Sequence, residues 1–282
     1  MSDVKFDEIG FWSEVKLDII RDYASAYSTI LSKQTSIARH LYIDAFAGAG
    51  IHVSKKSGEF VPGSPLNALN VTPPFSEYHF IDLNEARVRG LQELSDGRAD
   101  VTVHHGNCNR LLLDQIFPRC RYEDFSRALC LLDPYALSVD WQVLETAGCM
   151  KSVEIFYNFM MMDANMNVFW RTPERVASQQ SMRMTAVWGD ESWRDAAYKK
   201  EQRSLLDEGG FFEEKASNDR IAQAFKDRLR NVAGFRYVPD PIPMCNSSGA
   251  VVYYLFFASP NATGRDIVEH IFKKHAGRAA NG

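Results

Sequence analysis

The sequence has few cysteines, and their spacing is not typical of disulfide or metal sites. Five cysteines occur among 282 residues, and no pair has the C-x-x-C spacing. An odd number of unpatterned cysteines does not suit a complete disulfide framework, so we expect reduced thiols, as in a cytoplasmic protein, and we expect Cys108 and Cys130 to be buried rather than to bind a metal. They are Cys108, Cys120, Cys130, Cys149 and Cys245.

The sequence also lacks a long apolar run. Its first twenty residues include charged side chains from Asp3 to Asp18, a pattern that excludes a secretory signal peptide. No apolar stretch reaches the roughly 20 residues that a membrane-spanning helix needs. We therefore expect a soluble, cytoplasmic protein with no membrane partner.

Positive charge is not in excess, because the formal net charge is −4. Proteins that bind nucleic acid mainly through phosphates usually have a basic excess, so a nucleic-acid partner would require a local basic patch. Apolar residues make up 45% and charged residues 24% of the chain, which is typical of a folded globular protein.

Several motifs of common enzyme classes are absent. The sequence has no Walker A lysine motif, no G-x-S-x-G and no H-E-x-x-H. A G-x-G-x-x-G dinucleotide motif is also absent, since Val53 stands where its third glycine would be, and this disfavours a nicotinamide-dependent dehydrogenase. The adjacent His104 and His105 would point to opposite faces of a strand, so they predict no metal chelate.

Apolar patterning predicts an α/β fold. Helical spacing over residues 14–32, with Ser13 as the expected N-cap, precedes a buried strand at 40–46. Further strands alternate with helices, which predicts a Rossmann-like, doubly wound and mostly parallel sheet. The further strands are expected at 78–82, 101–106, 128–134 and 153–158, and the helices at 85–94, 110–117 and 141–147.

Three segments add to this alternating pattern. Residues 235–238 and 251–258 predict a C-terminal antiparallel hairpin that closes the sheet. Residues 51–75 form a long Gly-, Pro- and Ser-rich connection, and such loops are usually functional. Residues 160–225 predict a helical insertion between the fifth and sixth strands of a single domain over 1–282.

A glycine-containing turn follows the first strand. Its sequence, Asp-Ala-Phe-Ala-Gly-Ala-Gly over residues 44–50, allows the backbone to turn sharply and to approach a ligand at the carboxyl end of the sheet. An ordinary tight turn would also use glycine. We predict a cofactor-binding turn that includes Asp44, Phe46, Gly48 and Gly50.

Polar residues end three later strands. Asp82 could accept hydrogen bonds from both hydroxyls of a ribose, or could cap the helix beginning near Glu85. Asn107 could accept the amine of an adenine, or could form a local Asx-turn. Asp133, Pro134 and Tyr135 could bind a flat, amine-bearing acceptor, or could form a strand-terminating turn with a packed tyrosine.

The predicted chemistry is methyl transfer from a sulfonium to an amine, which depends on placement and on exclusion of water. In this prediction Asp133 and the Pro134 carbonyl accept hydrogen bonds from the acceptor amine, and Tyr135 stacks on the ring that carries this amine.

Three consecutive methionines occupy residues 160–162. They predict apolar packing, and the alternative is that they line the mouth of a substrate site.

The chain resembles the three-Cys-motif partner protein (TcmP) family over nearly its full length. That resemblance implies a separate partner, a three-cysteine iron–sulfur protein similar to radical-SAM proteins. The segments that carry the resemblance are GFWSEVKLD at 10–18, YIDAFAGAG at 42–50, PGSPLNA at 62–68, LLDPY at 131–135 and VVYYLFFASP at 251–260.

The catalytic core is more distantly similar to RlmJ-type adenine-N6 methyltransferases, which act on 23S ribosomal RNA. They share D-x-x-A-G-A-G and P-G-S-P, and they have two prolines where this chain has only Pro134. The resemblance implies that Lys16 and Ser64 contact the methionine part of S-adenosylmethionine. It assigns the ribose to Asp82, the adenine to Asn107 and the target amine to Asp133.

Two functions remain open from the sequence. The first is an S-adenosylmethionine-dependent methyltransferase acting on an amine of a nucleobase or nucleic acid. The second is a methyltransferase-like partner protein that docks on the three-cysteine iron–sulfur protein and has lost catalysis. The glycine turn with Asp82 favours cofactor binding in both cases.

Overall fold

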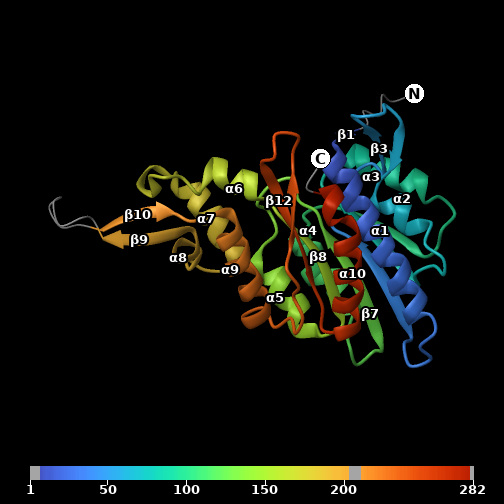
Figure 1. Cartoon of the computed structure of the whole chain (residues 1–282). Helices are drawn as coiled ribbons and strands as arrows, with labels where there is room; N and C mark the ends of the chain where they lie inside the picture. The colour runs from blue at the N-terminus through green and yellow to red at the C-terminus, as the bar shows by residue number, and fades with distance from the viewer. Residues whose placement is uncertain (1–6, 203–210, 280–282) are drawn as a thin grey trace.

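The computed structural model describes residues 7–202 and 211–279, which form a central sheet with helices on both faces (Figure 1). In the described residues the main sheet has seven strands in the order β11-β12-β8-β7-β2-β5-β6. The strands are β2 (Arg39–Asp44), β5 (Glu77–Asp82), β6 (Val101–His105), β7 (Ser126–Leu132), β8 (Val153–Phe159), β11 (Ile242–Cys245) and β12 (Val251–Ala258).

The direction of the strands confirms the predicted fold class. β2, β5, β6, β7 and β8 pair in parallel, whereas β12 is antiparallel to both β8 and β11. The chain switches sides of the sheet at β2, since β5 and β7 lie on either side of it. This is a doubly wound, Rossmann-like sheet, with the antiparallel hairpin at one edge.

Side chains alternate between two apolar layers along each strand. Tyr42 and Phe156 face a layer shared with α1 (Phe11–Leu31) and α10 (Ala262–Ala279). Leu41 and Ile155 face the opposite layer, shared with α5 (Trp141–Met150) and α9 (Asn218–Asn231). Burial on both faces explains why the strands are nearly continuous apolar runs in the sequence.

The remaining helices follow the predicted order with one irregularity. α3 (Glu85–Leu94) has the predicted bounds, while α4 (Cys108–Leu111) continues into a π-helical segment, Leu112–Ile116. None of the helices within the described ranges has both the length and the apolar character needed to cross a bilayer.

Two predicted boundaries were wrong. The N-cap of α1 is Gly10 rather than Ser13, because Gly10 is the last residue with an extended backbone before the helix begins at Phe11. The Trp12 ring lies against Gly10, and a Cβ added to Gly10 would come within 2.6 Å of that ring. The first strand of the C-terminal hairpin is Ile242–Cys245 rather than residues 235–238. Phe235 packs instead against the Gly148 position of α5, and Pro243 is accommodated because β11 is an edge strand.

The long connection at 51–75 contains secondary structure that the sequence did not predict. β3 (Ile51–Ser54) pairs with β4 (Phe60–Pro62) and with β1 (Asp7–Ile9), and α2 (Ser64–Leu69) follows. Strands of three or four residues are too short to show a periodic pattern.

The segment from 160 to 225 extends to one side of the sheet (Figure 1). Its helices are joined by an antiparallel hairpin that the sequence did not predict. The elements before α9 are α6 (Met161–Asn167), α7 (Ser178–Trp188), α8 (Trp193–Ala197), β9 (Tyr198–Gln202) and β10 (Phe211–Lys215).

Phe225 of α9 joins this segment to the sheet. Its ring is fully buried, and its centroid lies 4.7 Å from that of Phe159 and 5.3 Å from those of Phe256 and Trp188. Aromatic pairs at these distances contribute beyond the area that they bury.

We expect Phe225→Ala to lower the free energy of unfolding by about 3–5 kcal/mol, because it leaves a cavity between α9 and the sheet. Urea denaturation followed by circular dichroism measures this loss. Met182→Ala, at a side chain that is 63% exposed, is the matched control and should cost less than about 0.5 kcal/mol. Equal stability of the two variants would contradict the packing of α9 on the sheet.

Candidate functional site

A cavity of about 350 Å³ lies at the carboxyl ends of the central strands. In open α/β sheets, ligands bind at this edge, where the chain switches sides of the sheet. The structure brings most of the predicted site residues together here. The predicted residues that line the cavity are Lys16, Phe46, Gly48, Ser64, Asp133, Pro134 and Tyr135.

The glycine turn and the Pro-Gly-Ser-Pro loop pack directly against each other. The Gly63 amide donates to the Gly50 carbonyl over 2.8 Å, and a Cβ at Gly63 would lie 2.9 Å from that oxygen. Gly50 itself has a φ of +78°, and a Cβ there would meet Leu94 of α3 at 2.8 Å. Glycine is therefore required at both positions, and Ser64 is positioned on the cavity wall.

The carboxylate of Asp82 stabilises the same turn. It accepts hydrogen bonds from the Gly48 amide at 3.0 Å and from the Asn84 amide at 2.7 Å. Asn84, not Asp82, caps α3, so the alternative prediction of Asp82 as the cap was wrong. Asp82 is buried and is not among the residues that line the cavity, and its ribose contact stays a prediction.

An ion pair joins the first helix to the end of β7. The Lys16 ammonium donates to Oδ2 of Asp133, and the Asn158 amide donates to Oδ1 of the same carboxylate. Lys16 is 7% exposed and Asn158 is fully buried, which limits solvent screening of these contacts. Lys16 and Asp133, assigned to different ligands by the resemblance, are thus bonded to each other.

Asn158 was missed in the sequence, although a signal was present. It is one of two polar residues in the otherwise apolar strand β8, the other being Glu154. A buried polar side chain in such a run requires a partner, which here is Asp133.

Asp44 ends β2, two residues before the cavity-lining Phe46, and is completely buried. Oδ1 accepts from the Phe46 amide at 3.2 Å, while Oδ2 has no hydrogen-bond partner in the described part of the chain. Burial raises the pKa of Asp44 to about 7, against the opposing effects of the Ser64 hydroxyl and the Phe46 amide. The Asp133 carboxylate raises the pKa further and Lys16 lowers it.

Two predicted residues lie at the edge of the site. Asn107 is exposed, and its side chain accepts from the Arg110 amide at 3.2 Å as the cap of α4. The bond comes from the residue three positions on, so Asn107 is a helix cap rather than the Asx-turn of the alternative, and the adenine contact stays a prediction. Tyr135 is 64% exposed, with its ring 5.5 Å from the Arg87 guanidinium, so the alternative of a packed tyrosine was wrong.

The cavity has further walls that sequence reasoning did not assign. Trp12 and His52 line it from the first turn of α1 and from β3, and Tyr253 lines it from β12. Met160 also lines it while packing against both apolar layers, which confirms the predicted apolar packing, and the substrate mouth stays a prediction. His52 lies on the four-residue strand β3, which is too short for a periodic pattern to reveal, and Trp12 lies before the stretch that the periodic pattern assigned to the first helix.

No protein-family model matches the chain, and no curated protein matches it. Solved structures of similar arrangement include LPL1258 from Legionella pneumophila str. Philadelphia 1, of family model DUF519, with a TM-score of 0.47 and 11% identity over 94% of this chain and 93% of that chain. A protein from Thermobifida fusca YX assigned as a methyltransferase has a TM-score of 0.39 and 10% identity, over 87% and 81% of the two chains.

A third similar structure is YhhF from Escherichia coli, also assigned as a methyltransferase. Its TM-score is 0.32 and its identity 10%, over 69% of this chain and 86% of that chain. Structural similarity at these TM-scores does not indicate a function. The fold class follows from the strand order of this chain.

We expect the stability of the protein to depend on the ionisation of Asp44. Its pKa is 3.8 in the unfolded chain and about 7 in the folded protein, so the protonated form is favoured on folding. This contribution is fully present below pH 3.8 and is lost as the pH rises through about 7. Relative to Asp44→Asn, the wild type should therefore lose roughly 2–3 kcal/mol between about pH 5 and pH 8.

Chemical denaturation across this pH range measures the difference between the two proteins. Asp114→Asn, at a side chain that is 61% exposed, controls for the loss of one carboxylate and should follow the wild type. A constant difference between wild type and Asp44→Asn would show that Asp44 does not titrate in this range.

Proposed function

We propose that the chain is an S-adenosylmethionine-dependent methyltransferase that acts on an amine of a nucleobase. The observation that carries this proposal is the position of the cavity, between the glycine turn after β2 and Asp133 after β7. This is the crevice in which doubly wound sheets bind nucleotide-like ligands. Its volume of about 350 Å³ suits a small-molecule site.

Charged groups of both signs line the cavity, namely Lys16 and Lys55 with Glu8 and Asp133. A cofactor that carries both an ammonium and a carboxylate would find partners of opposite charge among them.

The resemblance to RlmJ-type enzymes supports a role for each residue. Lys16 and Ser64 would hold the methionine part of the cofactor, and both line the cavity. Asp82 would bind the ribose beside the turn that it already stabilises. Asn107 would bind the adenine once its side chain leaves the cap of α4.

When bound, S-adenosylmethionine supplies a methyl carbon whose bond to sulfur breaks as a bond to the acceptor nitrogen forms, with the electron pair remaining on sulfur. Asp133 and the Pro134 carbonyl would accept hydrogen bonds from the acceptor amine, and Asp133 would take the proton that the nitrogen loses. Tyr135, exposed at the cavity mouth, would stack on the acceptor ring.

A second candidate is the partner protein that docks on a three-cysteine iron–sulfur protein. The TcmP resemblance suggests it, and the pairing of Asp133 favours it. Both oxygens of that carboxylate are already bonded, to Lys16 and to Asn158. An acceptor amine would have to donate to the remaining lone pairs of the Asp133 carboxylate or displace one of these two hydrogen bonds.

The proposal predicts that Asp133→Asn slows transfer of a tritiated methyl group to adenine-containing RNA by about 100-fold or more, because it removes the proton acceptor. Affinity for S-adenosylhomocysteine should change by less than about tenfold, since the carbonyl oxygen of the substituted side chain can still accept a hydrogen bond. The exposed Asp114→Asn variant should behave as the wild type.

Two outcomes separate the candidates. Full activity of Asp133→Asn would remove Asp133 from the reaction. Absence of transfer by the wild type to any nucleobase substrate, together with a stable complex with a three-cysteine iron–sulfur protein, would favour the second candidate.

A further inference from the structure

A second and larger cavity, of about 660 Å³, lies at the opposite end of the sheet. It is lined by Arg127 and Glu154 near the starts of β7 and β8, whereas Asp133 and Asn158 lie at or just after the other ends of these strands. Roughly six residues of strand correspond to about 20 Å. The two cavities share no lining residue, so they are separate sites.

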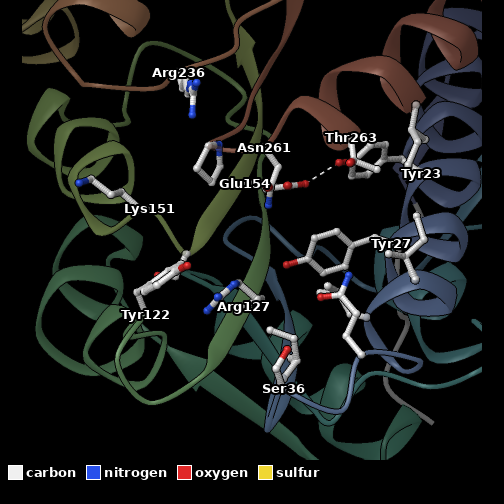
Figure 2. A pocket seen from close by; sticks show the side chains of 18 of the residues that line it. Tyr23, Tyr27, Ser36, Tyr122, Arg127, Lys151, Glu154, Arg236, Asn261 and Thr263 are labelled. Carbon is white, nitrogen blue, oxygen red and sulfur yellow. Dashed lines mark hydrogen bonds between the residues drawn. The ribbon is translucent and has the colours of Figure 1, made fainter.

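Three cationic side chains line this second cavity: Arg127, Lys151 and Arg236. Figure 2 shows them around the opening, with Tyr27 facing them. Within the residues that the structure describes, none of the three forms an ion pair with a carboxylate. Arg127 is positioned by the Tyr122 ring, whose centroid lies 4.0 Å from the guanidinium carbon.

The one carboxylate among the lining residues does not neutralise these cations. Glu154 is buried, and it accepts hydrogen bonds from the hydroxyls of Tyr23 and Ser259. Burial raises the pKa of Glu154 to about 7, which further reduces its negative charge near neutral pH. The cavity is therefore positively charged and suits an anion.

The start of α10 adds to this positive character. The helix begins at Ala262, and both Thr263 and Gly264 line the cavity. A Cβ at Gly264 would lie 2.8 Å from the Tyr23 hydroxyl and 2.9 Å from Oε1 of Glu154, so glycine is needed for this close approach. Amides in the first turn of a helix lack intrahelical acceptors and favour anions.

We propose that this second cavity binds a nucleotide through its phosphates. Arg127 and Arg236 hold the phosphates, with Lys151 at the rim, and the ring lies against Tyr27 and the apolar wall formed by Ile30 and Ile37. The volume exceeds what a free phosphate needs and falls within the range of small-molecule sites. This site is independent of the proposed methyl transfer.

Calorimetry with ADP and with inorganic pyrophosphate on the full chain tests the proposal. We expect the wild type to bind ADP, and to bind it at least about fivefold more tightly than pyrophosphate because of the ring contact. The double variant Arg127→Ala/Arg236→Ala should bind ADP at least about 30-fold more weakly. The matched control is Arg89→Ala/Arg110→Ala, which removes two exposed arginines outside both cavities and should stay within about twofold of the wild type.

Each remaining outcome overturns part or all of the proposal. Absence of ADP binding by the wild type, or equal weakening in both double variants, would overturn the site. Equal affinity for pyrophosphate and ADP would overturn the nucleotide assignment. Displacement of ADP by S-adenosylhomocysteine would place ADP in the first cavity instead.

The exposed Arg236→Ala single variant keeps the test valid if the double variant does not fold. It should weaken ADP binding at least about fivefold, and unchanged affinity would contradict the proposed phosphate contact. A failure to detect ADP binding would not contradict the proposed methyl transfer, because the calorimetric measurement uses neither RNA nor a methyl donor.

Discussion

The ion pair between Lys16 and Asp133 is the contact on which the site depends. It fixes α1 against the carboxyl end of β7, and the buried Asn158 amide fixes the other oxygen of the carboxylate from β8. A buried charge is costly unless it is paired and hydrogen-bonded, and here both conditions are met. Three elements from distant parts of the sequence are thereby held in one arrangement at the cavity.

The same elements also form the wall of the second cavity. Along α1, Tyr23 follows Lys16 by about two turns and bonds Glu154 at the opposite end of β8. Asp44 and Glu154 are both fully buried carboxyl groups with pKa values raised to about 7, and one lies by each cavity. The charge beside each cavity therefore changes near neutral pH.

The sequence predicted those parts of the fold and site that depend on long periodic patterns. The parallel strands are buried on both faces, so their apolar runs located β2, β7 and β8 and the polar residues that follow them. The glycine turn was predictable because glycine is the residue that most readily adopts positive φ, and Gly48 and Gly50 both adopt it. Parts that depend on tertiary packing were not predictable. Phe235 packs on α5 and β11 is the strand that pairs with β12, while the role of Asn158 is visible only beside Asp133.

Binding of S-adenosylhomocysteine, measured by calorimetry, tests the central claim most directly. We expect one site per chain for the wild type, at least about tenfold weaker binding by Asp82→Asn, and wild-type affinity in the exposed Asp114→Asn control. The Asp82 variant weakens both the expected ribose contact and the hydrogen bond to the Gly48 amide. Absence of binding by the folded wild-type protein would contradict a cofactor site at the glycine turn.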